Sequence, residues 1–294
     1  MKTSPLAVWA VGLSIWLATC ATASGQQEKY RYAETNRLVE LVTDAATLIR
    51  QHGEAAFPSL MKKGSRWRTG DLYLFVIDVK GYCFVHEDTS RIGKNISELK
   101  DINGKPIIQW FIRKALGASQ SGWTHYLWVK PGETNPVWKT TYTKLANAPS
   151  GGIYIVGAGL YNMKMEKAFA VEAVDDAIVL LHQMGPKAIP ILKDKTSEFV
   201  YKDTYVFVVD STYTVLVNPP FPGEEGHHVY DYQDVNGKFF FREFFRVANE
   251  KGAGWVDYVW PKPGEAKPCP KSSFVKKTVV RGVYYIVGTG IYIE

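Results

Sequence analysis

A twelve-residue motif that occurs twice constrains this chain more than any other feature of its sequence. Residues 122–133 read GWTHYLWVKPGE, and 132 residues later residues 254–265 read GWVDYVWPKPGE, with eight of the twelve positions identical. Flanking matches keep an offset of 131–133 residues. This period is longer than the roughly 20–50 residues of a solenoid repeat and corresponds to an independent domain of about 100–150 residues. The sequence therefore predicts two homologous domains, over residues 28–161 and 162–294.

The composition is that of an ordinary globular protein with a mildly basic surface. Hydrophobic residues make up 46% of the chain and charged residues 22%, which excludes a disordered chain. The formal net charge is +6, but the lysines are scattered and no Arg-rich run occurs. We therefore expect no nucleic-acid partner, although a positive field would favour small anionic ligands.

The amino terminus predicts export. Residues 1–23 combine a positive charge at Lys2, an apolar run from Leu6 to Leu17 and small residues at 21–23, as in a cleaved signal peptide. The apolar run is shorter than the roughly 20 residues of a membrane-spanning helix. We expect a periplasmic or secreted protein, with membrane anchoring as the alternative. Because the sequence stops after the second repeat, we expect any signalling output module to belong to another protein.

Local patterns predict the same order of elements in each repeat: helix, two strands, helix, three strands. Apolar residues at helical spacing indicate long amphipathic helices over about 28–51 and 162–184. Short helices are expected over 106–116 and about 239–249, and runs rich in branched and aromatic residues predict the strands. Short connections between the last strands favour antiparallel pairing. The predicted class is α+β, each domain having an antiparallel sheet of about five strands with short helices on one face.

Several repeated motifs together resemble a known family. They are the Phe-Val-Ile-Asp78 and Phe-Val-Val-Asp210 strand ends, the Asp-x-Asn-Gly turns, the Gly-Trp-x-x-Tyr-x-Trp strands and the terminal Gly-x-Gly-x-Tyr segments. Their order and double occurrence over residues 29–292 resemble two single Cache units in tandem. The Cache family comprises PAS-like extracytoplasmic sensor domains.

The resemblance implies a ligand-binding sensor function. Cache domains often bind a carboxylate or an amino acid, and they usually belong to chemoreceptors or sensor kinases. We therefore expect an exported small-molecule-binding protein that acts in signal transduction or chemotaxis through a separate membrane sensor kinase or chemoreceptor. The alternative is a structural or protein-interaction module whose pockets are filled by its own side chains.

Aromatic side chains on the repeated strands are candidates for the wall of a pocket. Tyr126 and Trp128 share one strand face, and Tyr258 and Trp260 are their counterparts. Their rings combine an apolar body with a polar group, which suits either a pocket or a core. Trp123 faces the other way and is expected in the core.

Cationic and polar candidates complete the predicted site. Lys139 lies in a strand beside aromatic residues, and Lys276 is taken as its counterpart in the second repeat, with Lys277 fitting nearly as well. Arginine suits bidentate carboxylate recognition, although a helical arginine is often simply exposed. The remaining candidates are Arg113 and Arg246 on the short helices, His86 and Asn218 at strand ends, Trp110, and Tyr142.

The repeats differ where a pocket is expected. Trp110 corresponds to Glu243 and His86 to Asn218, and the second short helix is rich in phenylalanine and could fill its own cavity. We therefore expect the first domain to bind the ligand. Familiar catalytic motifs are absent from the sequence, so no enzyme activity, cofactor or metal site is predicted.

Overall fold

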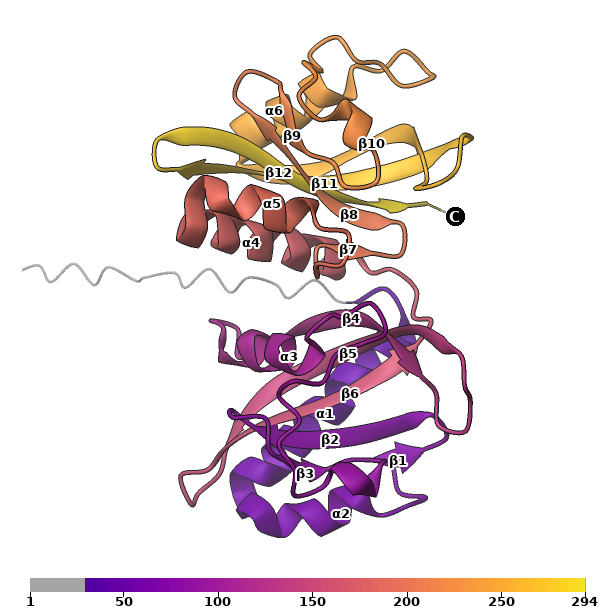
Figure 1. Cartoon of the computed structure of the whole chain (residues 1–294), viewed down its shortest axis with the longest axis vertical. Coiled ribbons are helices and arrows are strands. Elements are labelled where there is room, and N and C mark those ends of the chain that lie inside the picture. Colours follow the sequence, from indigo (N-terminus) through magenta and orange to yellow (C-terminus); the bar gives the residue numbers. More distant parts are fainter. Residues whose placement is uncertain (1–29, 294) are drawn as a thin grey trace, which may run out of the picture.

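The computed structural model describes residues 30–293, so the predicted signal peptide at residues 1–23 lies outside the described residues. Two domains follow one another along the chain, each built on its own six-stranded antiparallel sheet (Figure 1). The predicted α+β class and the tandem duplication are confirmed.

The first domain has the predicted order of elements with a few short additions. Its sheet runs in the order β1-β2-β6-β5-β4, and β3 pairs with β2 outside this path. The elements are α1 (Ala33–His52), a 3-10 turn (Gly53–Ala56), α2 (Phe57–Met61), β1 (Arg68–Thr69), β2 (Leu72–Asp78), β3 (Cys83–Val85), a 3-10 turn (Thr89–Arg91), α3 (Ile107–Leu116), β4 (Ser121–Val129), β5 (Pro136–Asn147) and β6 (Ile153–Tyr161).

The second domain repeats this topology as β10-β11-β12-β8-β7, with β9 on β8. Its elements are α4 (Lys167–Met184), a 3-10 turn (Gly185–Lys187), α5 (Ala188–Lys193), β7 (Val200–Tyr201), β8 (Thr204–Asp210), β9 (Val215–Val217), a 3-10 turn (Pro222–Glu224), α6 (Phe240–Lys251), β10 (Ala253–Pro261), β11 (Pro268–Val280) and β12 (Val283–Tyr292).

Both long helices begin about five residues later than predicted, because the segments before them are held in an extended conformation. The Glu166 carboxylate accepts the backbone N–H groups of Arg31 and Tyr32, both at 2.9 Å. Glu166 is itself extended and directly precedes α4. One side chain therefore fixes the start of α1 and stands at the start of α4.

Alternating residues of β2 divide the first domain into two apolar layers. Leu74 and Val76 pack with α1 and α2, whereas Phe75 and Ile77 pack with α3 on the opposite face. Helices therefore cover both faces of the sheet, and the short helices are divided between them, where the sequence predicted them on one face.

The repeated Gly-x-Gly segment is explained by close side-chain packing. A Cβ atom on Gly157 would lie 2.2 Å from the ring of Phe75, and one on Gly288 would lie 2.3 Å from the ring of Phe207. The second glycine of each segment makes room for a lysine, because a Cβ on Gly159 would lie 2.9 Å from Cε of Lys139. The motif therefore serves the core of both domains.

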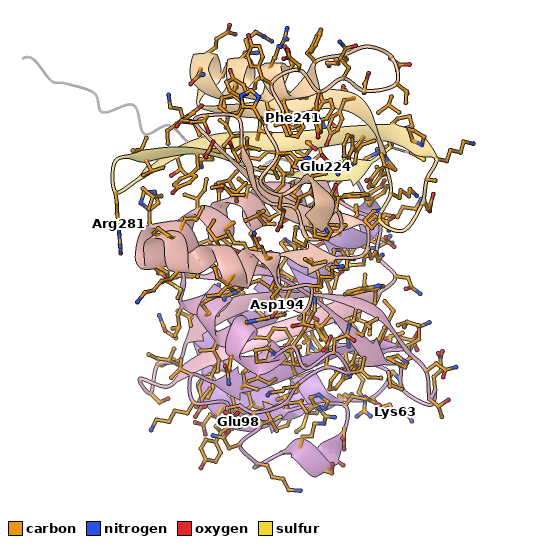
Figure 2. All side chains as sticks on the ribbon, turned by 45° about the horizontal axis from the view of Figure 1, so that its top comes forward. Lys63, Glu98, Asp194, Glu224, Phe241 and Arg281 are labelled. Atoms are coloured by element: carbon orange, nitrogen blue, oxygen red, sulfur yellow. The ribbon has the colours of Figure 1, made fainter. Side chains whose placement is uncertain are left out.

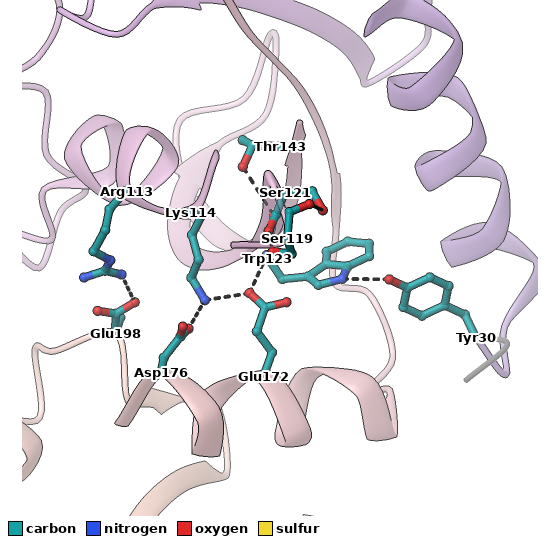
Figure 3. Close-up of polar contacts among 11 residues, drawn as sticks. Tyr30, Arg113, Lys114, Ser119, Ser121, Trp123, Thr143, Glu172, Asp176 and Glu198 are labelled. Carbon is teal, nitrogen blue, oxygen red and sulfur yellow. Dashed lines mark hydrogen bonds and ion pairs between the residues drawn. The ribbon is translucent and has the colours of Figure 1, made fainter. Parts of the chain in front are cut away.

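The two domains are joined by an ion cluster between α3 and α4 (Figure 3). Lys114 Nζ lies 2.6 Å from Glu172 Oε1 and also contacts Asp176. Glu172 Oε1 accepts the backbone N–H of Trp123 at 2.8 Å as well. The leading helix of the second domain is therefore anchored to a helix and an edge strand of the first.

Candidate functional site

The first domain contains an open pocket of about 560 Å³ at one end of its sheet. Its lining comes from Tyr73 on β2, from residues 86–91 after β3, from Ile102, and from residues 127–136 of the β4–β5 hairpin. Strand ends and loops that are far apart in sequence meet here, which is a common place for a ligand site. The volume is within the range of small-molecule pockets.

Arg91 supplies an incompletely satisfied cation to this pocket. Its Nε donates to Asp88 Oδ2 at 3.0 Å, and its guanidinium carbon lies 5.1 Å from the centre of the Trp128 ring. Its Nη1 atom is buried and has no hydrogen-bond partner within the described residues. A buried N–H group without a partner is costly, and because Arg91 lines the pocket its guanidinium would stabilise an oxyanion bound there.

His86 provides a second donor. Its Nδ1 atom accepts the backbone N–H of Asp88 at 2.9 Å, which leaves the proton of the neutral ring on Nε2. Burial and the nearby Arg91 lower the pKa of His86 to about 4, so the ring is neutral at physiological pH. Its ring centre lies 5.3 Å from that of Tyr73.

The carboxylates in the lining already have partners. Glu87 forms an ion pair with Arg68. Asp88 accepts from the backbone and the hydroxyl of Ser90, at 3.0 and 2.6 Å, in addition to Arg91. The pocket therefore offers hydrogen-bond donors and aromatic surface, whereas its anionic groups are engaged.

Lys139 is close to the pocket but does not line it. Its Nζ lies 4.0 Å from the ring centre of Tyr73, 4.6 Å from that of Tyr161 and 3.4 Å from the Tyr161 hydroxyl. Only 2% of the residue is exposed, and burial lowers its pKa to about 7. A ligand contact with Lys139 would require Tyr73 to move.

In the second domain, side chains nearly fill the cavity that is lined by Tyr205, Asn218 and Trp260, the counterparts of the pocket residues Tyr73, His86 and Trp128. The residual volume of this cavity is about 20 Å³. Phe240 stacks on Tyr258 with ring centres 4.5 Å apart and an angle of 10° between the planes. Phe221 packs edge-on against Tyr205 and Trp260, at 6.0 and 5.9 Å.

Two sequence differences, in the loops that follow β3 and β9, explain much of the difference between the two pockets. The backbone of Arg91 donates to Asp88, and in the second domain Glu224 donates to Phe221 in the same pattern. Phe221 therefore stands where the first domain has Asp88, and Glu224 stands where it has Arg91. Compared with the first domain, the second therefore lacks both the open pocket and the arginine that lines it.

The predicted counterpart of Lys139 is wrong. In the sheet, Lys139 is opposite Tyr126 and Lys271 is opposite Tyr258, so Lys271 is the true counterpart. Lys271 Nζ is also caged by tyrosines, 4.1 Å from the Tyr205 ring centre. Lys276 lies five residues further along the strand, where its Nζ binds Asp175 of α4 at 2.7 Å.

Two predicted arginines lie outside both pockets. Arg113 forms an ion pair with Glu198 in the second domain. Arg246 is exposed on α6, where it pairs with Glu243 and Glu250. Neither guanidinium faces a pocket, because each is engaged by carboxylates on its own helix or across the domain junction.

The remaining predicted residues divide between pocket and core. His86 and Trp128 meet in the first pocket, and Asn218, Tyr258 and Trp260 meet in the filled second one. Three others are buried elsewhere. The hydroxyls of Tyr126 and Thr141 are hydrogen-bonded at 2.9 Å, and Tyr142 packs on Trp123 in the apolar layer that contains α1. Trp110 lies beside Lys105.

Tyr73 and Arg91 line the pocket but were not predicted as site residues. Tyr73 carried a signal as a repeated position, since it matches Tyr205 at the common offset. Arg91 had no such signal, because the loop that carries it shares little sequence with its counterpart.

Comparisons with known proteins agree with this architecture. A family model described as Cache domain matches residues 59–177, and one described as Single Cache domain 2 matches residues 180–294. The methyl-accepting chemotaxis protein McpP of Pseudomonas putida is 29% identical over 92 residues, which are 31% of this chain and 16% of that protein. The match thus spans a small part of the receptor.

Two solved structures are similar to one domain each. A periplasmic sensor domain of a chemotaxis protein is 30% identical, with a TM-score of 0.35, over 42% of this chain and 88% of that chain. A Cache chemosensory domain described in terms of carboxylic acid recognition is 26% identical, with a TM-score of 0.37, over 42% of this chain and 91% of that chain.

Within residues 30–293, none of the helices is long and apolar enough to cross a membrane. The two family models follow one another along the chain, and each includes the strands of one of the two sheets. The two halves of this chain are Cache domains in tandem, and the chain belongs to the Cache family of extracytoplasmic sensor domains.

Proposed function

We propose that this chain is an exported sensor protein whose first Cache domain binds a small carboxylate. The observation that carries the proposal is the buried, unpartnered Nη1 of Arg91 at a ligand-sized pocket within the described residues. Family membership supports a binding rather than a catalytic role, and the similarity to a methyl-accepting chemotaxis protein supports a role in chemotaxis signalling.

The chemistry of the pocket favours a carboxylate over a cation. Arg91 Nη1 and His86 Nε2 are both donors, and Trp128 and Tyr73 provide surface for an apolar ligand body. An amino-acid ligand would also need an acceptor for its ammonium group, but Glu87 and Asp88 are already paired. Amino acids are therefore expected to bind more weakly than carboxylates of the same size.

The two domains would have different roles, ligand binding in the first and structural support in the second. The second domain, whose pocket is filled by Phe240 and Phe221, suits a supporting role, the alternative that the sequence left open for the whole chain. The liganded first domain would then be recognised by a separate membrane partner, a chemoreceptor or a sensor kinase.

Calorimetric titration of the full chain with a panel of small carboxylates and the matching amino acids tests the proposal. Arg91→Gln should weaken carboxylate binding at least tenfold, because a charge-assisted hydrogen bond contributes about 1.5–3 kcal/mol. Arg246→Gln is the matched control, since Arg246 lies on α6 away from both pockets. If no compound binds, the sensor function is refuted; if binding survives Arg91→Gln unchanged, the site is wrong.

A further inference from the structure

A second large cavity among the described residues is a groove at the junction of the two domains, outside the pocket described above. Its volume is about 780 Å³. One side is formed by residues 30–32 before α1 and by the connection 162–168; the other by the β7–β8 turn, by Lys262 and by the end of β12. The groove thus touches the segments that lead into both long helices.

Five basic residues line this groove against three acidic ones. The basic residues are Arg31, Lys164, Lys167, Lys202 and Lys262, and the acidic ones are Glu166, Asp203 and Asp257. Counted by formal charge alone, the groove is therefore electropositive.

The acidic residues are already engaged. Glu166 accepts two backbone N–H groups at 2.9 Å, and Asp203 lies 3.7 Å from Lys262. Asp257 accepts the Ser272 hydroxyl at 2.5 Å. Lys262 is engaged by Asp203, and Lys202 Nζ donates to the backbone oxygen of Met163 at 2.8 Å, so Arg31, Lys164 and Lys167 are the available charges of the groove.

Each of the five basic residues lies over an aromatic ring, 4.6–5.7 Å from the ring centre. Arg31 and Lys164 lie 5.4 and 5.3 Å from the ring centre of Tyr32, and Lys167 lies 4.6 Å from that of Trp255. Within residues 30–293 these three make no ion pair with a carboxylate. Aromatic contacts limit the freedom of the side chains, so less entropy is lost when they bind an anion.

We propose that this groove is a second ligand site, which binds a multivalent oxyanion such as a polycarboxylate or a phosphate compound. A ligand with two or more anionic groups can contact Arg31 through one group and Lys164 or Lys167 through another. A bound anion would bridge the amino-terminal segment and the second domain, and would therefore stabilise the junction.

Titration calorimetry of the full chain with pyrophosphate and, separately, with citrate in metal-free buffer tests this site. Lys164→Gln/Lys167→Gln should weaken binding at least tenfold. Lys62→Gln/Lys63→Gln is the matched control, because both lysines are exposed near α2, and Lys63 is seen at the first domain's distant end (Figure 2). Binding by one probe alone would identify the anionic group, and binding by both would indicate general oxyanion recognition.

Added salt and a variant of the first pocket show whether the probes bind in the groove. Affinity should fall several-fold between 50 and 300 mM salt, because partly exposed charges are screened. Arg91→Gln should leave the binding of these probes unchanged, whether or not the first pocket binds a carboxylate. The proposal is overturned if neither probe binds, if both lysine pairs weaken binding equally, or if Arg91→Gln abolishes it.

Discussion

The stability of this protein should rise with pH between 7 and 9, because two buried lysines cannot easily hold a proton in the folded state. Burial lowers the pKa of both Lys139 and Lys271 to about 7, from an ordinary value of 10.5. Each Nζ faces tyrosine rings, and among the described residues neither forms an ion pair with a carboxylate. Lys139→Met/Lys271→Met removes both groups while keeping most of their apolar volume.

The direction follows from proton binding. Between pH 7 and 10.5 the unfolded chain binds a proton on each lysine that the folded chain lacks, so raising the pH removes a proton preferentially from the unfolded state and stabilises the folded one. With these pKa values, the increase from pH 7 to 9 is about 2 kcal/mol for each lysine. Lys105, whose pKa burial lowers to about 8, adds to the same trend.

The range stops at pH 9 because other groups reverse the trend above it. Burial raises the pKa of Cys83 to about 11, from 9.0, so the unfolded thiol ionises first and favours unfolding. Tyrosines with raised pKa values, such as Tyr73 at about 12, act in the same way from about pH 10.

Urea unfolding followed by far-UV circular dichroism at pH 7, 8 and 9 measures the effect. The wild-type midpoint should increase with pH, the Lys139→Met/Lys271→Met midpoint should increase much less, and Lys62→Met/Lys63→Met should behave as wild type. A double variant that keeps the full wild-type increase would show that these lysines stay charged when folded, and would refute the reasoning.

Three further changes test the packing. Phe240→Ala should lower the free energy of unfolding by about 3–5 kcal/mol in urea titration, since it empties the filled second pocket; a loss below 1 kcal/mol would contradict this packing. Gly157→Ala should lower the melting temperature, because its Cβ would meet the ring of Phe75, whereas Gly223→Ala, with no neighbouring atom within 4 Å, should not. Lys114→Met should speed hydrogen exchange in α4, because half-buried Glu172 loses a charge-assisted hydrogen bond that contributes about 1.5–3 kcal/mol; unchanged exchange would show that the ion cluster does not anchor the helix.

Most of the architecture was predictable from sequence because it depends on local spacing that occurs twice. Periodic apolar residues located α1 and α4 near their observed positions, and the strand motifs gave the order of the sheet. The start of α1 was missed because a single carboxylate, Glu166, holds the segment before it extended through contacts 134 and 135 residues away in sequence. Such a contact leaves no local pattern.

The site was only partly predictable, for two different reasons. Lys271 could have been found, because Lys139-Thr-Thr-Tyr and Lys271-Ser-Ser-Phe match at the common offset of 132, whereas Lys276 requires an offset of 137. Arg91 could not have been found, because the strand before its loop is similar in both repeats but the loop itself differs in sequence. Its importance depends on one buried nitrogen that only the three-dimensional structure reveals.

The turn at residues 101–105 gives the first pocket a physical connection to the second domain. Ile102 lines the pocket, and Asp101 accepts the backbone N–H of Leu127, another lining residue, at 3.0 Å. At the other end of the same turn, Lys105 Nζ donates to the backbone oxygen of Val200 at 2.9 Å. The second domain has the same turn, but there Lys238 donates to Asp257 within its own domain. The same turn therefore makes different contacts in the two domains. Its lysine contacts the other domain only in the first, so a movement of the first pocket's wall would be transmitted to the second domain through Lys105.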